Sequence, residues 1–492
     1  MDIKEILNPK AKPEQYSDII AALKLGRSQG TPNISITQKG LEPLLHDIND
    51  PAKRPDKKIK RPDAEENQAT ALQVSTDSSA DRAKFEYVPV ARVALALQKL
   101  IVNRAIAFLF GNDPTISADL REGTQDEAVL QAVLKVLRQS KARTLNREVA
   151  RSLLTTTEAA EYWWPMEQER ETDAYGFKSS FKLKCAIFSP LNGDTLWPYF
   201  DTNGDMIAFS REYQTRTADN ERLRHFDTFT AKTLYKWTVK EGEWVMDEGY
   251  PKANPIGKIP VVYCCQPKVE WADVQSLIDR LETLLSNFAD TNDYHASPKI
   301  FTTGTIYGWA EKGESGAVIE GEDGATAQYL SWAQAPESVK LEIETLLRMI
   351  HTITQTPDVS FDSVKGLNLS GLALKLLFMD AHLKVQDKRE IFDEHLQRRN
   401  SIIQAYLAQM NAKDKAFVES CQSLVAEPII QPYMIEDENS KVATLMAATG
   451  QKSIAARKTA IQRLGWTDNP EAELDEIQNE ENSASENNFM LG

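Results

Sequence analysis

The chain has 492 residues and a formal net charge of −15, from 57 Lys and Arg against 72 Asp and Glu. Apolar residues make up 41% of the sequence, which supports a packed core and excludes an intrinsically disordered chain. The length corresponds to two to four structural units. The acidic balance argues against simple electrostatic capture of nucleic acid or of an anionic membrane.

The four cysteines, Cys185, Cys264, Cys265 and Cys421, are too few and too scattered for a disulfide framework. Because no Cys/His cluster accompanies them, we expect no metal site and no other cofactor. The start of the chain lacks the apolar run of a secretory signal. Polar residues interrupt the most apolar stretch, 88–110, so we expect a buried amphipathic helix there and no membrane span.

The first 84 residues predict little regular structure. One short helix is expected over 13–25, and a Pro- and Lys-rich segment follows at 50–63. No aromatic residues interleave with its charges, which favours a solvated linker over a nucleic-acid patch. Residues 64–82 are polar and are expected to form a loop.

Helices and then strands are predicted from residue 85 onward. Apolar residues over 93–109 recur at helical spacing and end at the stop signal 111–114. Two more helices are expected over 125–140 and 142–158. Short aromatic and β-branched runs then predict an antiparallel meander, followed by a strand at 261–264. The runs of the meander are 161–164, 182–188, 197–200, 206–213, 224–230 and 233–239.

Two striped helices are predicted next, over 271–296 and 336–353, with short Gly-rich strands over 298–333 between them. A stripe this narrow requires a partner helix, so we expect the two helices to pack as an antiparallel pair. The packing positions are Leu277, Ile278, Leu281, Leu284, Leu346 and Ile350.

The last part of the chain begins with a loop over 354–369 and a long helix over 370–410, for which Ser370 can serve as the N-cap. A strand is expected at 428–433, with small helices at 437–448 and 453–464. The tail, 468–488, has eight acidic residues and no basic one, which predicts disorder.

No catalytic or nucleotide-binding motif is complete. Residues 366–371 have the G-x4-G spacing of a phosphate loop, but Leu372 and Ala373 follow where Lys and Ser/Thr are needed. Residues 201–205 resemble a calcium loop, yet a hairpin turn explains them better. We therefore expect no catalytic residues and a structural protein, not an enzyme.

Residues 85–470 resemble the portal proteins of tailed bacteriophages, the head-to-tail connectors, in the branch typical of siphophages. The resemblance depends on five segments in the family's order: a helix ending in Leu-Phe-Gly, a G-x-I-P strand, a helix with a Leu-Ile-Asp core, an S-G-x-A-L-K helix start and a C-terminal helical part. They are residues 92–113, 254–262, 273–290, 370–375 and 428–475.

The resemblance implies an α+β portal fold with a mixed α/β wing, antiparallel stem helices, a small α/β clip, a long kinked wing helix and a helical crown. The implied divisions are an N-terminal arm (1–84), the wing (85–269), the stem helices (270–297 and 334–353), the clip (298–333), the tunnel loop (354–369), the long wing helix with its returning strand (370–434), the crown (435–470) and an acidic disordered tail (471–492).

The resemblance also implies a function. Such proteins form a ring, expected to be dodecameric, at one capsid vertex in the virion after assembly in the host cytoplasm. Double-stranded DNA passes through the ring, weakly bound, during packaging and ejection. Partners would be the terminase, which supplies the ATPase, the major capsid or scaffold proteins, and head-completion adaptor or tail proteins; no membrane is involved.

The tunnel loop would face the DNA, and the long helix would begin just after it. The loop residues are Pro357, Asp358, Val359, Ser360, Phe361, Asp362, Ser363, Val364, Lys365, Gly366, Leu367 and Asn368, and the helix start is marked by Ser370, Gly371 and Lys375. Two alternatives stay open: a packaging-related enzyme with a degenerate nucleotide motif, and a head scaffold or minor capsid protein without a channel.

Overall fold

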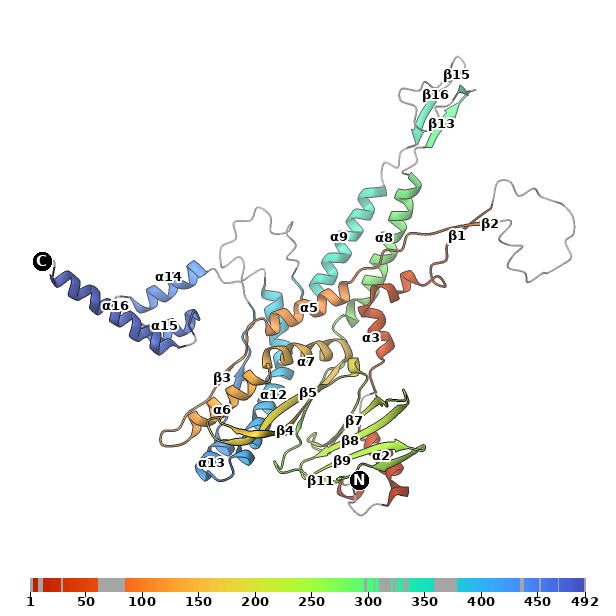
Figure 1. The fold of residues 1–492 in the computed structure, drawn as a ribbon. Coiled ribbons are helices and arrows are strands. Elements are labelled where there is room, and N and C mark those ends of the chain that lie inside the picture. Colours follow the sequence, from red (N-terminus) through yellow and green to blue (C-terminus); the bar gives the residue numbers. More distant parts are fainter. Residues whose placement is uncertain are drawn as a thin grey trace. The chain divides into compact units, whose positions relative to one another are not determined.

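The structure is a computed structural model (Figure 1). It describes residues 3–7, 12–27, 30–60, 85–295, 299–304, 306–308, 320–321, 324, 326–330, 335–357, 378–433, 438–450, 453–467 and 469–490. Contacts divide the chain into two compact units: unit 1 is 1–356 with 383–432, and unit 2 is 357–382 with 433–492. Helices and antiparallel sheets occur together, so the fold is α+β, as predicted.

The larger sheet of unit 1 is an antiparallel meander in the order β10-β9-β8-β7-β6, with β11 paired to β9. Its strands are β6 Thr195–Phe200, β7 Met206–Arg216, β8 Arg222–Thr230, β9 Thr233–Lys240, β10 Glu243–Met246 and β11 Lys252–Ala253. The Asp201 carboxylate closes the β6–β7 turn by accepting the backbone N–H groups of Asn203 (2.8 Å) and Asp205 (2.9 Å). This Asx turn confirms the hairpin interpretation of residues 201–205.

A second, three-stranded sheet has the order β12-β4-β5. Its strands are β4 Glu158–Thr172, β5 Ser179–Phe188 and β12 Val261–Cys265. The predicted meander is thus divided between two sheets, because a short 3-10 turn, Pro190–Asn192, and Gly193 at φ +86° separate β5 from β6. Phe188, Phe209 and Phe229 share one buried cluster that joins the two sheets.

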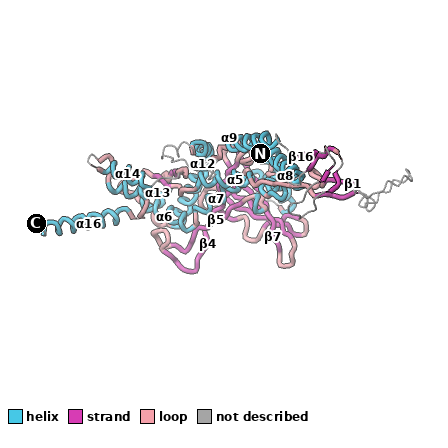
Figure 2. The backbone as a smooth tube through the Cα atoms, turned by 90° about the horizontal axis from the view of Figure 1, so that it is seen from above, coloured by secondary structure: helices cyan, strands magenta, loops and turns pink. Residues whose placement is uncertain are grey.

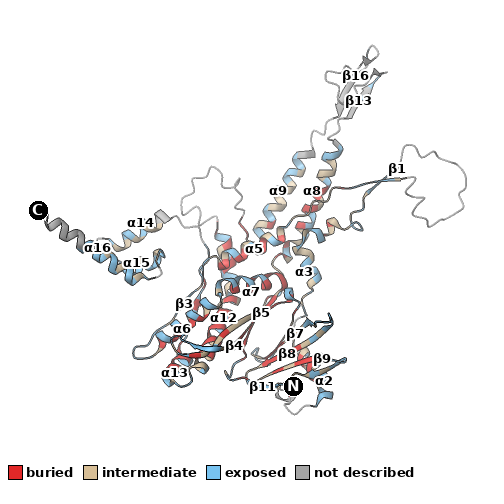
Figure 3. Ribbon diagram, viewed as in Figure 1, coloured by how far each residue is buried: buried red, intermediate tan, exposed pale blue. Residues whose placement is uncertain are grey.

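Five helices build the rest of the body of unit 1, and Figure 2 shows α5, α7 and α12 grouped beside β4 and β5. They are α5 Leu97–Phe110, α6 Asp126–Gln139, α7 Ala142–Thr156, α12 Met379–Met410, which belongs to unit 1 from residue 383 onward, and α13 Lys415–Ser423. The short strands β3 Thr115–Ser117 and β17 Glu427–Ile429 pair beside them. The buried residues follow the facing sides of these helices and sheets (Figure 3).

The N-terminal region has more structure than the sequence predicts. The elements described there are α1 Ile3–Ile6, α2 Tyr16–Leu25, α3 Ile34–Leu41 and β1 Lys57–Lys60, which pairs with β2 Phe85–Val88. Ile20 and Leu23 of α2 are buried in one cluster with Phe226 and Trp237 of the larger sheet. Packing against this aromatic face stabilises helices that are too short to be stable alone.

The helix predicted from residue 93 begins later, at Leu97, and residues 89–96 are not helical. Alternate backbone N–H groups in this stretch bond to side chains of a helix almost 200 residues further along the chain. Those tertiary bonds replace the helical ones that the apolar periodicity favours.

The two striped helices are present as α8 Gln275–His295, preceded by a 3-10 turn Ala272–Val274, and α9 Ala335–Ile353. The region between them contains the short strands that were predicted. They are β13 Lys299–Thr303 paired with β16 Thr326–Leu330, and β14 Ile306–Gly308 paired with β15 Glu320–Gly321.

Unit 2 contains α14 Glu438–Thr449, α15 Arg457–Leu464 and α16 Pro470–Met490. The prediction of a disordered acidic tail is wrong, because residues 470–490 form α16. Proline opens this helix, and Glu471 and Glu473 in its first turn complement the positive helix end. Ion pairs Arg457–Glu481 (2.9 Å) and Lys458–Glu471 then join it to α15.

Candidate functional site

The helix pair α8–α9 and the segment that follows α9 are the part of the chain that the sequence singles out. The two helices contact one another, and Arg280 Nη2 of α8 lies 2.7 Å from Glu342 Oε1 of α9. The apolar packing positions face inward: Ile278, Leu281, Leu284 and Ile350 are buried, and Leu277 and Leu346 are half-buried against the same core.

The base of the helix pair is built into the main core of unit 1. Trp271, Val274 and Ile278 pack in one cluster with residues of α5, α7 and α12. In this cluster the rings of Phe110 and Phe392 meet edge to face, with centroids 5.2 Å apart. The pair is therefore fixed to the body at one end.

A ladder of side-chain acceptors on α8 holds the non-helical stretch before α5. The backbone N–H of residue 91 donates to Asp290 Oδ1 (2.8 Å), that of residue 93 to Ser286 Oγ (2.9 Å), and that of residue 95 to Glu282 Oε1 (2.8 Å). The acceptors are four residues apart, so they lie on one face of the helix. Ser286 and Glu282 are both buried, which makes these bonds costly to leave unmade.

The same face of α8 also binds the N-terminal region. His46 Nδ1 lies 2.6 Å from Glu282 Oε1, and both side chains are buried. The hydrogen bond to Glu282 raises the pKa of His46, in spite of burial. Arg54 donates to Asn287 Oδ1 and to Asp290 Oδ2, each at 2.9 Å.

A buried ion pair lies where α9 ends. Lys384 of α12 is 2.7 Å from Glu270, and its ammonium group also donates to the carbonyl of Thr354 at 2.8 Å. Lys388 contacts the same carboxylate at 3.1 Å. Burial lowers the pKa of Lys384, while Glu270 opposes that shift. The chain just beyond α9 is thus tied to α12 by a charge-assisted hydrogen bond.

The predicted loop, 354–369, begins at this anchor, since Thr354 is its first residue. Pro357 is described, whereas 358–368 and the predicted helix start, Ser370, Gly371 and Lys375, lie outside the described residues. The part of the long helix that is described is α12, which begins at Met379.

A second buried charge cluster connects α12 to the smaller sheet. Arg399 donates to both carboxylate oxygens of Glu161 on β4 and to Asn146 Oδ1 on α7, and His395 Nε2 lies 3.2 Å from Glu161 Oε2. Burial alone would raise the pKa of Glu161, but Arg399 and His395 outweigh it and hold the pKa at about 2. This carboxylate is therefore ionised inside the protein.

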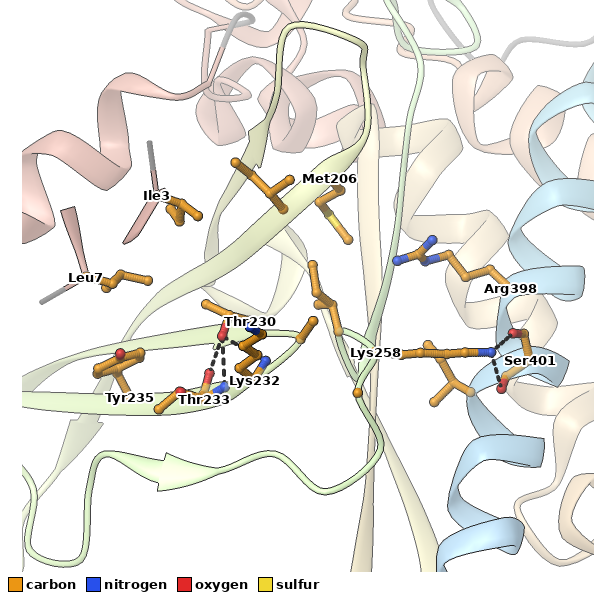
Figure 4. Close-up of a pocket in the computed structure, with 15 residues that line it drawn as sticks. Ile3, Leu7, Met206, Thr230, Lys232, Thr233, Tyr235, Lys258, Arg398 and Ser401 are labelled. Carbon is orange, nitrogen blue, oxygen red and sulfur yellow. Dashed lines mark hydrogen bonds between the residues drawn. The ribbon is translucent and has the colours of Figure 1, made fainter. Parts of the chain in front are cut away.

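A pocket of about 710 Å³ opens between α1, the larger sheet and α12 (Figure 4). Its wall is mainly apolar, and Lys258 and Arg398 lie at one end, where the Lys258 ammonium donates to Ser401 Oγ at 2.5 Å. Burial and the neighbouring Arg398 lower the pKa of Lys258. The lining residues include neither a carboxylate nor a cysteine nor a histidine.

Neither metal-binding nor membrane-crossing features emerge from the described residues. No group of three or more His, Cys, Asp or Glu side chains in them could hold a metal ion. Within the same described ranges, every helix is too short or too polar to cross a membrane.

Sequence reasoning missed the two buried charge clusters. Glu161 stands in the aromatic run Glu-Tyr-Trp-Trp, and a carboxylate in such a strand signals a buried partner. Lys384 interrupts an apolar helix face in the same way. Their partners are far away in the sequence and could not be assigned from it.

Comparisons with known proteins cover most of the chain. The family described as "Phage portal protein, SPP1 Gp6-like" matches residues 65–487. No curated protein sequence matches. Among solved structures, a chain from the neck of an empty GTA particle, computed with C6 symmetry, is similar with a TM-score of 0.38 and 10% identity, over 75% of this chain and 89% of that one. A chain from the virion of a native gene transfer agent (GTA) particle has a TM-score of 0.37 and 10% identity, over 74% and 99%.

Proposed function

We propose a function from one premise: this chain belongs to the phage portal proteins of the SPP1 Gp6-like family. Copies of it form a ring, with twelve subunits, at one vertex of the capsid. Double-stranded DNA passes inward through the ring during packaging and outward at ejection. The observation that carries the proposal is the family match over residues 65–487, which include both sheets, the helix pair and α12.

In this proposal α8 and α9 are the stem, the short strands between them are the clip, and the two sheets with α12 are the wing. The helices of unit 2, α14 to α16, belong to the crown and its extension. The fixed base of the helix pair supports the stem role, because a stem has to transmit forces to the body without unpacking. The bond from Lys384 to the carbonyl of Thr354 supports a tunnel loop over 354–369, because it fixes the first residue of that loop to α12.

Partners follow from the same role. The terminase docks on the ring during packaging and supplies the ATPase, and head-completion adaptor or tail proteins replace it afterwards. Capsid or scaffold proteins surround the wing, and assembly takes place in the host cytoplasm before the ring becomes part of the virion. The subunit charge of −15 suits DNA that slides without being held, because few phosphates would be neutralised.

Electron microscopy of the purified full chain tests the proposal. Rings with a central hole of DNA width are expected; monomers alone, at high concentration and in several buffers, would contradict it. ATP turnover by the isolated chain would favour a packaging enzyme instead. Deleting residues 357–368 should impair packaging or DNA retention, and a deletion that leaves both unchanged would refute the tunnel-loop role.

A further inference from the structure

The pocket of about 710 Å³ beside α12 is apolar over most of its wall, and its volume lies in the range of small-molecule sites. The apolar side chains come from the α1 region, from the larger sheet with the segment that follows it, and from α12. They are Ile3, Leu7, Met206, Ile207, Ile259 and Ile402. The hydroxyl group of Thr230, at the turn between β8 and β9, donates to the carbonyl of Thr233 (2.8 Å) and is therefore already used inside the chain. This part of the pocket suits an apolar group.

Two cations lie at the end of the pocket that α12 forms (Figure 4). The Lys258 ammonium donates to Ser401 Oγ (2.5 Å) and, more weakly, to the Ser401 carbonyl oxygen (3.4 Å). Both acceptors are neutral. Arg398 lies three residues before Ser401 on the same helix, so these two residues are neighbours on the surface of α12. The third cation of the lining, Lys232, lies away from α12, on the turn between β8 and β9.

No acidic residue of the pocket balances these cations. Among the described residues, no carboxylate forms an ion pair with Lys258 or with Arg398, and the lining contains none. Glu394, one turn before Arg398 on α12, lines a smaller adjoining cavity that Arg398 also borders. In a chain with 72 acidic and 57 basic residues, a pocket with cations and no acid contrasts with the rest of the molecule. Its local field attracts anions.

The surroundings of Lys258 favour an anion as its partner. Partial burial and the neighbouring Arg398 lower the pKa of Lys258, so both act against its positive charge. An anion bound between the two cations would reduce their repulsion and accept charge-assisted hydrogen bonds from them. A neutral apolar ligand would displace water from the cations without replacing its hydrogen bonds. The ligand that fits both ends of the pocket therefore has one anionic end and an apolar body.

We infer that this pocket binds an alkyl carboxylate, with the carboxylate between Lys258 and Arg398 and the alkyl chain along the apolar wall. Such a ligand contacts the α1 region, the larger sheet and α12 at once. Because it binds the folded chain only, it stabilises unit 1. The inference goes beyond the proposed function and does not depend on the ring.

Isothermal titration calorimetry of the full chain with three probes tests the inference. Dodecanoate has both the charge and the chain, acetate has the charge alone, and dodecyltrimethylammonium has the same chain with the opposite charge; each is used below the concentration at which it forms micelles. We expect one dodecanoate per chain, bound at least tenfold more tightly than either of the other probes. Equal affinities for dodecanoate and for either control probe, or no saturable binding of dodecanoate, would overturn the inference.

A pair of matched variants gives a second measurement. K258M/R398M keeps long side chains but removes both cations, and it should weaken dodecanoate binding at least tenfold, or by about 1.4 kcal/mol. The control R222M/K240M removes the same two kinds of charge at exposed positions, at the ends of β8 and β9 far from the pocket, and should leave the affinity unchanged.

Equal affinities of the two variants would contradict the inference. If K258M/R398M does not fold, which circular dichroism would show, the three probes on the wild type decide the question alone. A wild type that binds no dodecanoate, with a folded K258M/R398M that no longer assembles, would indicate that a second copy of the chain fills the pocket, and the inference would be wrong. Dodecanoate binding is measured whether or not rings form, so this inference and the proposed function fail separately.

Discussion

Replacing Arg399 by Met should be among the most destabilising single changes in unit 1. The substitution removes the guanidinium that bonds to Glu161 and Asn146 and leaves a carboxylate with 0% exposure beside His395 alone. A pKa of about 2 in place of the ordinary 4.5 corresponds to about 3 kcal/mol of stabilisation of the ionised Glu161. Breaking a buried ion pair typically costs about 3–5 kcal/mol. The pKa of Glu161 and this general value therefore give similar estimates of the stability that R399M loses.

The dependence on pH gives this prediction a definite sign. In the wild type the pKa of Glu161 lies below its unfolded value, so its contribution is present above about pH 4.5 and is lost as the pH falls toward 2. In R399M the guanidinium no longer opposes the effect of burial, so the pKa of Glu161 rises. The variant therefore loses less stability at pH 5 than at pH 8, because the buried carboxyl can take up a proton.

Guanidinium unfolding followed by tryptophan fluorescence, at one fixed protein concentration, measures these differences. E161Q/R399M is the matched control: without the buried charge it should be more stable than R399M alone. A loss below about 1 kcal/mol for R399M, or a double variant whose loss equals the sum of the two single losses, would refute the reasoning.

Three further predictions concern other contacts. The pKa of His46, followed by NMR, should exceed its ordinary value, and the stability it provides is complete below about pH 6.5 and is lost as the pH rises through the folded pKa; an ordinary pKa would contradict the buried pair. K384M removes the ammonium that binds the end of α9, so amide hydrogen exchange of residues 354–356 should accelerate at least tenfold, and unchanged exchange would argue against the anchor. G26A should destabilise unit 1 by about 1–3 kcal/mol in thermal unfolding, because a Cβ at this position would overlap the ring of Tyr199. G30A has open space and should be neutral, and equal effects of the two variants would disprove the steric cause.

Local patterns predicted the elements whose partners are near in the sequence. The alternation of aromatic and polar residues and the Asx turn at Asp201 define the meander without any distant contact. The stripes of α8 and α9 likewise predicted that these helices need partners. The division into two sheets was missed, because the six strand runs look alike and the 3-10 turn at 190–192 is short.

Distant contacts decide the parts that were predicted wrongly. Residues 93–95 have a helical apolar spacing, yet acceptors on α8, about 190 residues away, hold their backbone in another conformation. The acidic composition of 468–488 predicts disorder. That prediction considers the segment alone and omits the cations of α15 that pair with Glu471 and Glu481. In both cases the partner, and not the segment itself, determines the structure.

The ladder on α8 joins every second N–H group of residues 91–95 to every fourth side chain of the helix, and these two spacings are not equal in length. Two residues of extended chain advance about 6.6 Å, whereas four residues of helix advance about 6.0 Å, so the mismatch grows by roughly 0.6 Å at each step. The ladder also cannot be extended at either end. The next donor would be residue 89, but Pro89 has no N–H, and the next acceptor would be residue 278, but the Ile278 side chain has no acceptor atom. Three bonds are therefore as many as this geometry allows. They define a single axial register, and a slip of α8 by one residue along its axis would break all three together.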